Sequence, residues 1–357
     1  MKVVTVVGAR PQFIKLAPVS RFLRQRHEEV LVHTGQHYDP NMSDIFFREL
    51  DIPTPNYNLS VGSGTHGRQT AEMMIRLEEV MERESPQATI VYGDTNSTLA
   101  GALVAAKRHV PLLHVEAGLR SYNRAMPEEV NRVLTDHLSD VLCCPTETAL
   151  RNLEREGITR GAHLTGDVMY DAVLYNAELA RQRSGVLKRL WLTPQGYALA
   201  TVHRAENTDD PHRLATIVDA LNELPGPIVL PLHPRTRKVL TTQGLDLMPH
   251  VLVVEPVGYL DMLALEMNAR LILTDSGGVQ KEAYFLGVRC ITLRDETEWV
   301  ETVDAGWNTL VGADAQRILA AATAAHAARF GPTPGRPALF GDGQAHVRIV
   351  DLLAEVG

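Results

Sequence analysis

The amino-acid sequence predicts an α/β protein with two doubly wound domains. Short apolar runs that suit buried strands alternate with helical segments along the whole chain, which is typical of parallel sheets built from βαβ units. The scheme occurs twice, with a junction between Val168 and Gly196. A length of 357 residues is also long for one domain, so two doubly wound domains are the simplest interpretation.

In the first half, the apolar runs are separated by polar turns and helices. The run "KVVTVVG" precedes a helix from Pro11 to about Arg26, and "EEVLVHTG" is the next strand. "ATIVYGD" precedes a helix from Asn96 to about Arg108, and "PLLHVEAG" precedes the helix "MPEEVNRVLTDHL". "DVLCCPTE", a helix that ends near Arg155, and the strand in "AHLTGD" complete this half.

The second half repeats the scheme. Its expected strands lie in "YALATVHR", "GPIVLPLHP", "VLVVEP", "ARLILTDSGG" and "RCITLRDE", each followed by a polar turn or a helix. The Ala-rich stretch at 319–328 is expected to be helical, because Ala has the highest helix propensity. We place the boundary between the two halves at residues 172 and 173.

Composition and charge exclude several classes of function. The chain has 35 Lys and Arg against 43 Asp and Glu, and its formal charge of -8 argues against non-specific binding of nucleic acid. No apolar stretch is long enough to span a membrane, and the first residues suit a strand and a turn rather than a signal peptide. The three cysteines suggest neither a disulfide framework nor a zinc site, so we expect a cytoplasmic protein without a metal.

Polar motifs follow the expected strands in both halves. In open parallel sheets, ligands bind beyond the carboxyl ends of the strands. Seven motifs rich in His, Arg, Asp and Glu stand at such positions: "GARPQ", "TGQH", "GDTN", "VEAGLR", "TVHRAEN", "LHPRT" and "TDSGG". They predict a cleft lined from both halves of the chain.

The stretch "LTDSGGVQKEA" predicts a phosphate-binding helix start in the second half. Gly277 and Gly278 allow backbone N–H groups to approach a ligand, and the N-terminus of the helix carries partial positive charge. Ser276 can cap the helix or donate to a phosphate oxygen. Glu282 lies four residues beyond Gly278 on the same helix face, where a carboxylate can accept from both hydroxyls of a ribose.

An ordinary turn with an N-cap is the simpler interpretation of this stretch. However, His203 and Arg204 follow a neighbouring strand of the same half and add two basic side chains near the glycines. This combination favours a diphosphate site.

The first half supplies carboxylates instead. Asp94 follows "TIVY", Glu116 follows "LLHV", and Glu128 and Glu129 open the helix after "RAMP". Asp94 could be only an N-cap, and glutamates in a first helical turn offset the helix dipole. Glu116 stands at the end of an apolar strand where no cap is needed. Carboxylates in one half and phosphate donors in the other suit proton chemistry on a sugar nucleotide.

Taken together, "GARPQFIK", "GDTNSTLAG", "HVEAGLRS", "MPEEVNR", "PTETA", "HRAEN", "TDSGGVQKEA" and "GDGQA" resemble the non-hydrolysing UDP-N-acetylglucosamine 2-epimerases. The resemblance runs from Lys2 to about Ile349. It implies the GT-B architecture, with two Rossmann-like domains and a C-terminal helix that crosses back onto the first. The first domain would then be residues 1–172 with a crossing helix at about 344–357, and the second domain residues 173–343.

The resemblance also implies a reaction. UDP is eliminated across C1 and C2 of the sugar to give a 2-acetamidoglucal, and UDP then adds back with C2 inverted, without a metal or a redox cofactor. By matching motifs, Asp94, Glu116 and Glu128 carry the acid–base role, which requires at least one group for each face of C2. His203 helps to stabilise the departing diphosphate.

Other residues match by the same resemblance. Arg10 and Lys15 match residues that contact the nucleotide sugar, and Glu282 matches the glutamate that binds the ribose. Gln36 and His37 match a region that holds a second, activating substrate molecule in bacterial relatives. The family further implies a homodimer whose small-molecule partner is a UDP-sugar, with no nucleic acid and no membrane.

Departures from the family pattern leave the sugar open. Many relatives have Thr-Glu-Arg-Pro-Glu where this chain has "TEWVE", so Trp299 replaces an arginine that contacts the substrate, and Met262 replaces an aromatic residue that often packs on uracil. The sequence favours UDP-N-acetylglucosamine, with a UDP-2,3-diacetamido-2,3-dideoxy-glucuronate as the alternative. A GT-B glycosyltransferase, which would leave the three carboxylates unexplained, and a non-catalytic UDP-sugar sensor are further alternatives.

Overall fold

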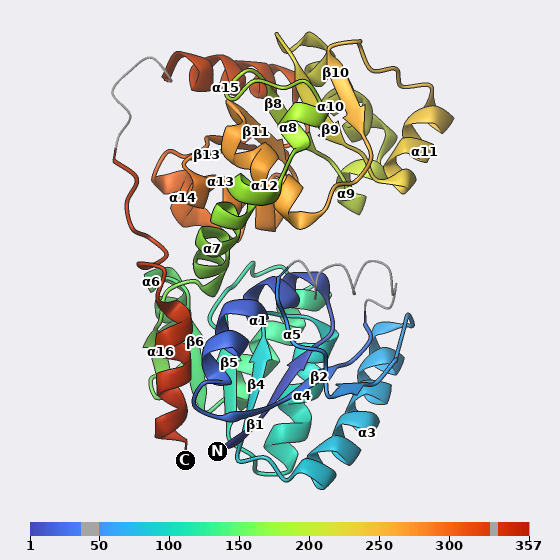
Figure 1. Cartoon of the computed structure of the whole chain (residues 1–357). Coiled ribbons are helices and arrows are strands. Elements are labelled where there is room, and N and C mark those ends of the chain that lie inside the picture. Colours follow the sequence, from blue (N-terminus) through green and yellow to red (C-terminus); the bar gives the residue numbers. More distant parts are fainter. Residues whose placement is uncertain (37–49, 329–334, 357) are drawn as a thin grey trace. The chain divides into compact units, whose positions relative to one another are not determined.

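The structure, a computed structural model, describes residues 1–36, 50–328 and 335–356. The chain divides into two compact units (Figure 1). The N-terminal unit consists of Met1–Ala172 together with Ala338–Gly357, and the C-terminal unit consists of Val173–Pro337. Each unit is built around its own parallel sheet, in agreement with the doubly wound fold class that the alternating pattern predicts.

Within the described residues, the N-terminal unit has a seven-stranded parallel sheet in the order β3-β2-β1-β4-β5-β6-β7. The strands are β1 (Lys2–Val7), β2 (Glu28–His33), β3 (Tyr57–Asn58), β4 (Ala88–Tyr92), β5 (Leu112–Val115), β6 (Val141–Cys144) and β7 (Ala162–Leu164). Every residue of β4, β5 and β6 is buried, so these strands appear in the sequence as continuous apolar runs. The strand order reverses between β1 and β4, which makes the loops after these strands the topological switch point.

Helices cover this sheet. They are α1 (Arg10–Leu23), α3 (His66–Glu84), α4 (Asn96–Lys107), α5 (Pro127–Leu138), α6 (Glu147–Arg155) and the start of α7 (Val168–Arg183). Helix α4 approaches the sheet very closely, because a Cβ atom on Gly101 would lie 2.9 Å from Cγ1 of Val91. Pro11 stands in the first turn of α1, where its missing N–H costs no hydrogen bond. Helix α1 therefore starts directly after β1, at the switch point.

The end of the chain returns to the N-terminal unit. Helix α16 (Ala345–Asp351), which continues as a 3₁₀ turn at Leu352–Glu355, packs against α1 (Figure 1). The ring of His346 contacts the ring of Phe22 edge-on, and its backbone N–H donates to Asp171 at 2.7 Å. This arrangement confirms the crossing helix that the family resemblance implies.

Within the described residues, the C-terminal unit has a six-stranded parallel sheet in the order β10-β9-β8-β11-β12-β13. The strands are β8 (Ala198–Thr201), β9 (Ile228–Pro231), β10 (Val251–Val254), β11 (Leu271–Thr274), β12 (Cys290–Thr292) and β13 (Asn308–Leu310). The helices are α8 (Val186–Arg189), α9 (Ala205–Thr208), α10 (Pro211–Glu223), α11 (Pro234–Gln243), α12 (Tyr259–Asn268), α13 (Gly277–Leu286), α14 (Val300–Asp304) and α15 (Ala315–Ala328). The order reverses between β8 and β11, so the loops after these strands form the second switch point.

Each unit has its own hydrophobic core. In the N-terminal unit, Val4, Val6 and Val91 on the strands pack with Met73 and Leu77 on α3. In the C-terminal unit, a second cluster joins strands β8, β9 and β11 to α10 and α15. These close-packed interiors hold the strand ends in place, so each loop that follows a strand begins at a fixed position.

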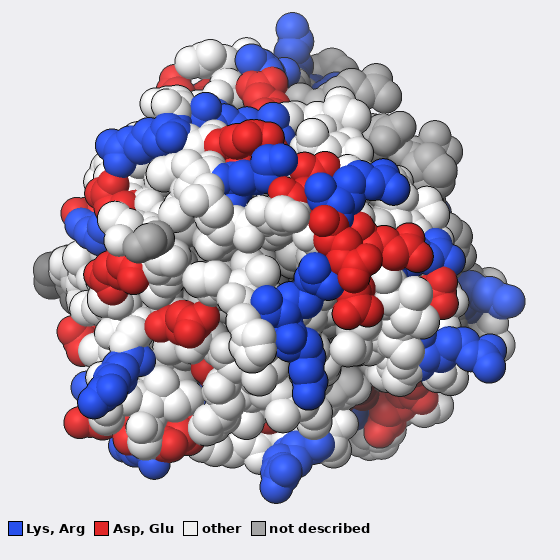
Figure 2. All heavy atoms as spheres, turned by 90° about the horizontal axis from the view of Figure 1, so that it is seen from below, with Lys and Arg blue, Asp and Glu red and all other residues white. Residues whose placement is uncertain are grey.

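The surface carries mixed charge on the face that Figure 2 draws, where Lys and Arg side chains are interspersed with Asp and Glu side chains. A face of mixed sign lacks the single-sign field that attracts nucleic acid. Among the described residues, none of the helices has the length and apolar character needed to cross a bilayer.

Candidate active site

The loop after β1 is shaped by close packing at the first switch point. A Cβ atom on Gly8 would lie 2.1 Å from the hydroxyl oxygens of both Thr34 and Ser97, so only glycine fits there. The side chain of Gln12 accepts hydrogen bonds from the N–H groups of Gly8, at 2.7 Å, and Ala9, at 3.0 Å. The loop that carries Arg10 is thus fixed, although the side chain of Arg10 lies outside the described part of the structure.

The structure brings Lys15 and Glu116 together in a buried ion pair. Lys15 lies on α1, and Glu116 follows β5 in a left-handed backbone conformation with a φ of 72°, which is strained for a residue with a side chain. Gly93, at a φ of 61°, lies beneath the pair, and a Cβ atom there would be 3.2 Å from Oε2 of Glu116. Backbone strain of this kind concentrates at functional sites, which supports a chemical role for Glu116.

Asp94 forms an ion pair with Arg132 of α5, and Arg132 also pairs with Glu129 at 3.0 Å. The interpretation of Asp94 as an N-cap is wrong, because Thr95 is the N-cap of α4 and its hydroxyl accepts from the N–H of Thr98. The side chain of Asp94 is 29% exposed, whereas that of Arg132 is buried. Asp94 is therefore available to a ligand while Arg132 balances its charge.

The two glutamates that open α5 have different surroundings. Glu129 is buried, and its carboxylate accepts from the backbone N–H groups of Ser121 and Tyr122, both at 2.9 Å. Glu129 thus fixes the loop between β5 and α5. Glu128 is exposed, and within the described residues no side chain or backbone group hydrogen-bonds or pairs with its carboxylate. Glu128 is the carboxylate of this edge that can change partners without breaking an ion pair.

Gln36 lies at the same edge of the sheet. Its side-chain oxygen accepts from the backbone N–H of Ser97 at 3.2 Å and from the hydroxyl of Ser97 at 2.7 Å. His37, its neighbour in the expected activator site, lies outside the described residues. The structure therefore places one of these two residues, next to the start of α4.

The glycine-opened helix of the C-terminal unit has the expected form. Ser276 is the N-cap of α13 and its hydroxyl accepts from the N–H of Val279, while Gly277 and Gly278 form the first turn. A Cβ atom on Gly277 would lie 3.6 Å from Nε1 of Trp299 and 3.8 Å from Nη2 of Arg204. The N-terminus of α13 therefore presents backbone N–H groups beside a guanidinium, which is a suitable setting for an anion.

Asp275 links the ends of β8 and β11 at the second switch point through its carboxylate. The sequence motifs did not single out this residue. Asp275 is fully buried and accepts from the backbone N–H groups of His203 and Arg204, both at 3.0 Å, and from the side-chain amide of Asn207 at 3.2 Å. Nδ1 of His203 lies 3.2 Å from Asp275. These bonds place His203 and Arg204 next to Ser276.

A buried acid accompanies Arg204. Glu298 pairs with Arg294 at 3.1 Å. Burial raises the pKa of Glu298, but the hydrogen bond and the positive charge of Arg294, with a smaller contribution from Arg204, outweigh burial and leave the pKa below its ordinary value. Glu298 is therefore anionic and faces two arginines at the helix start.

Glu282 lies on α13 with its carboxylate buried. It lies next to the carboxyl group of Glu266 of α12, which is fully buried. Burial first, and then the nearby charge of Glu282, raise the pKa of Glu266 well above its ordinary value. Two carboxyl groups in contact share a proton, so Glu282 can keep its charge while Glu266 carries the hydrogen.

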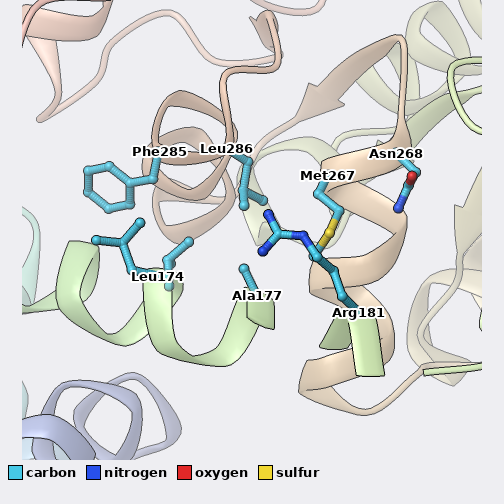
Figure 3. Close-up of a pocket in the computed structure, with 8 residues that line it drawn as sticks. Leu174, Ala177, Arg181, Met267, Asn268, Phe285 and Leu286 are labelled. Atoms are coloured by element: carbon cyan, nitrogen blue, oxygen red, sulfur yellow. The ribbon is translucent and has the colours of Figure 1, made fainter. Parts of the chain in front are cut away.

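The C-terminal unit also contains a cavity of about 390 Å³, shown in Figure 3. Residues of α7, α12 and α13 line it, including Leu174, Met267 and Leu286. Leu286 ends α13, and a ten-residue helix spans roughly 15 Å, so this cavity is separate from the glycine end of α13. Within the described residues, no group of three or more His, Cys, Asp or Glu side chains could hold a metal ion.

Comparisons with known proteins agree with this geometry. The family model described as UDP-N-acetylglucosamine 2-epimerase matches residues 21–354. The chain belongs to this family. A "UDP-N-acetylglucosamine 2-epimerase homolog" of Methanococcus maripaludis is 53% identical, over 99% of each chain. The UDP-2,3-diacetamido-2,3-dideoxy-D-glucuronate 2-epimerase of Pseudomonas aeruginosa is 52% identical, over 100% of each chain.

A solved structure of Methanocaldococcus jannaschii UDP-GlcNAc 2-epimerase, in complex with UDP-GlcNAc and UDP, matches with a TM-score of 0.89. It is 45% identical to this chain and covers 99% of it and 100% of the other chain. This similarity confirms the GT-B architecture. As a member of the UDP-N-acetylglucosamine 2-epimerase family, the chain is an isomerase that acts on a UDP-sugar.

The candidate site includes residues that the sequence motifs did not indicate. Arg132 pairs with Asp94, Asp275 binds the N–H groups of His203 and Arg204, and the charge of Glu298 faces Arg204. Only Asp275 had a usable signal, since it stands beside Ser276 at the end of a strand. The others act through partners distant in sequence.

Proposed function

We propose that this chain inverts C2 of a UDP-linked 2-acetamido sugar by elimination of UDP and its re-addition. The observation that carries the proposal is the chemistry at the two switch points. The switch point of the N-terminal unit bears three carboxylates in different electrostatic settings, Asp94, Glu116 and Glu128. The switch point of the C-terminal unit bears a glycine-opened helix with His203 and Arg204 beside it.

Departure of UDP is the first requirement, because the proton on C2 is only weakly acidic. The bond between C1 and the diphosphate oxygen breaks, and negative charge develops on the diphosphate. The N–H groups at the start of α13, together with His203 and Arg204, are preorganised to stabilise this charge. Arg10, by the family resemblance, adds a further positive charge.

Proton exchange at C2 completes the reaction. Loss of the C2 proton to a carboxylate leaves a C1–C2 double bond, and the return of UDP to C1 with a proton on the other face of C2 gives the epimer. At least two groups are needed, one for each face. We assign this work to Asp94, Glu116 and Glu128, with Lys15 and Arg132 balancing the charges of Glu116 and Asp94.

The nucleotide is held by α13 and its surroundings. We propose that the amides of Gly277 and Gly278 and the hydroxyl of Ser276 bind the diphosphate, and that Glu282 accepts from the ribose hydroxyls. The buried position of Glu282 next to Glu266 gives it one fixed orientation. The proposed pair Gln36 and His37 would contact a second, activating substrate molecule.

Two observations favour UDP-2,3-diacetamido-2,3-dideoxy-glucuronate as the sugar nucleotide. The chain is 52% identical to the P. aeruginosa enzyme named for that substrate and 45% identical to the M. jannaschii UDP-GlcNAc 2-epimerase, while the 53% identical M. maripaludis relative is named as a homolog of UDP-N-acetylglucosamine 2-epimerase. Trp299 also stands where the family resemblance places an arginine that contacts the sugar, and it is buried, with Nζ of Lys281 4.0 Å from its ring centroid. The sequence by itself favours UDP-N-acetylglucosamine, converted to UDP-N-acetylmannosamine, which is the second candidate.

The cellular role follows from either substrate. An epimerised 2-acetamido sugar supplies mannosamine-type units for cell-surface polysaccharide. We propose that the enzyme works as a homodimer in the cytoplasm, where its buried cysteines stay reduced, and needs no cofactor. Light scattering of the purified protein tests the dimer.

The decisive experiment incubates the enzyme with each UDP-sugar in deuterated water and follows C2 by NMR. Deuterium at C2 together with the manno epimer supports the proposal, and we expect the diacetamido uronate to give the larger kcat/KM by about tenfold or more. Faster exchange with UDP-N-acetylglucosamine would select the second candidate. Transfer of the sugar to an acceptor, or binding without any exchange, would instead support a glycosyltransferase or a sensor.

A further inference from the structure

His114, near the end of β5, is fully buried and lies between two hydrogen-bond acceptors. Its Nδ1 is 2.6 Å from Oδ1 of Asp136, and its Nε2 is 2.7 Å from the carbonyl oxygen of Gly93. A neutral imidazole carries one N–H and can donate to one of them, whereas an imidazolium donates to both. The geometry therefore requires a second proton on this histidine or a proton on Asp136.

The other contacts of Asp136 show which group holds the proton. Its second oxygen accepts from the N–H of Gly118 at 3.1 Å and from Nη1 of Arg120 at 2.6 Å. Burial raises the pKa of Asp136, but His114 and Arg120 outweigh burial and leave the pKa below its ordinary value. Because its second oxygen already accepts from a guanidinium and a backbone N–H, Asp136 acts as the anion, and the proton is on His114.

The charge balance of the buried network agrees. Arg120 binds Glu156 through two hydrogen bonds, at 2.6 and 2.7 Å. With a protonated His114, two positive groups face two negative groups, Asp136 and Glu156. The neighbouring thiol of Cys144 stays neutral, because burial, and then the charge of Asp136, raise its pKa to about 12. With a neutral His114, the buried Asp136 would have Arg120 as its positive partner, and it would share Arg120 with Glu156, a carboxylate that is 27% exposed.

The network holds the two loops that carry the proposed acid–base residues. Gly93, whose carbonyl binds His114, directly precedes Asp94 and lies beneath the Lys15–Glu116 pair. Gly118, whose N–H binds Asp136, lies two residues after Glu116. Glu116, with its strained φ, is thus flanked by the loops of Gly93 and Gly118, which both bind the His114–Asp136 pair.

We propose that His114 is a positioning residue, an imidazolium that donates to both Asp136 and the carbonyl of Gly93 and so fixes Asp94 and Glu116 in the geometry needed for proton exchange at C2. This deepens the proposed function and rests on it, because it assumes that both carboxylates act on the substrate. His114 itself touches no reacting atom. Its charge, rather than its volume, sets the backbone of both loops.

The first test is the variant His114→Gln, in which one amide nitrogen can donate to only one of the two acceptors. We expect kcat for C2 epimerisation to fall by about 100-fold, with KM and the Kd for UDP within twofold, since UDP binds the C-terminal unit. The matched control is His137→Gln, which changes an exposed histidine 3.4 Å from Glu156 at the rim of the same network and should keep kcat. A folded His114→Gln enzyme with more than half the wild-type kcat overturns the proposal.

The second test uses the wild-type protein and does not depend on the variant folding. Neutron diffraction of a deuterated crystal should show deuterium on both ring nitrogens of His114. A ring with one deuterium overturns the proposal. Failure of the wild-type enzyme to exchange C2 of either sugar would overturn the proposed function, and with it the positioning role, whereas the neutron result would still decide the charge of His114.

Discussion

Lys15 of α1 and Glu116 after β5 form an ion pair in which both side chains are largely buried, at 11% and 6% exposure. Removal of one partner leaves an uncompensated charge in a low-dielectric site. We expect Lys15→Met to lower the free energy of unfolding by about 3 kcal/mol, measured by urea denaturation. It should also reduce kcat for epimerisation. Lys107→Met, which changes an exposed lysine in the last turn of α4, is the control and should leave both quantities unchanged. Unaltered stability in the Lys15 variant would contradict the burial of the pair.

Asp275 gives a prediction for UDP binding by the C-terminal unit. Asp275→Ala leaves three donors without an acceptor, the N–H groups of His203 and Arg204 and the amide of Asn207. We expect a loss of about 3 kcal/mol in unfolding free energy, because each unpaired buried group costs about 1–3 kcal/mol. Displacement of His203 and Arg204 should also raise the Kd for UDP by about tenfold or more, measured by calorimetry.

The control for this variant is Asp210→Ala. Asp210 is the N-cap of α10 in the same unit, so its loss should cost about 1 kcal/mol of stability. It should leave the Kd for UDP unchanged. Equal effects of the two variants on UDP binding would mean that Asp275 acts only through stability.

Gly277→Ala tests the helix start as the diphosphate site. The nearest atom to a Cβ there would be 3.6 Å away, an ordinary contact, so the variant should fold with nearly unchanged stability. The added methyl group would stand where the phosphate approaches the backbone N–H groups, and we expect the Kd for UDP to rise by about tenfold or more. Gly185→Ala, at the N-cap of α8 with a nearest atom also at 3.6 Å, should keep the wild-type Kd. Wild-type UDP binding by Gly277→Ala would place the diphosphate elsewhere.

The fold was largely predictable because buried strands leave a direct trace in the sequence. Strands such as β4 and β11 are apolar at every position or nearly so, and the helices between them supply the alternation. The order of the strands was not predictable, since β1 pairs with both β2 and β4 through contacts distant in sequence. Helix α3 was missed, although its buried Met73, Leu77, Val80 and Met81 have helical spacing. Strand β3 is two residues long and leaves no pattern.

The site was predictable where a residue follows a strand and unpredictable where its partner is remote. Asp94, Glu116 and Ser276 each stand just after a strand, so their positions were visible in the sequence. That Asp94 pairs with Arg132 rather than capping α4 depends on how α5 packs, which no local pattern encodes. The same holds for His114, whose charge follows only from its two acceptors in the folded chain.

Glu266 gives a pH-dependent prediction. Burial, followed by the charge of Glu282, raises its pKa well above the value in the unfolded chain. The folded state therefore binds a proton more tightly than the unfolded state does. This stabilisation is fully present below the unfolded pKa, near 4.5, and is lost as the pH rises through the folded pKa. Other groups that face Glu266 are Tyr197 and Cys290, whose own pKa values are raised mainly by burial.

Glu266→Gln removes this titration while keeping a hydrogen-bond donor for Glu282. Relative to wild type, the variant should therefore gain stability as the pH rises from 5 towards the folded pKa of Glu266, measured by urea denaturation, with about 1.4 kcal/mol for each pH unit over which Glu266 stays protonated in the folded state alone. Glu255→Gln, which changes an exposed carboxylate on the same unit, should give a difference that stays flat with pH. Because the amide still orients Glu282, the variant should bind UDP with wild-type affinity. A difference that stays flat with pH over this range would show that Glu266 is ionised in the folded protein and that the two carboxyl groups share no proton.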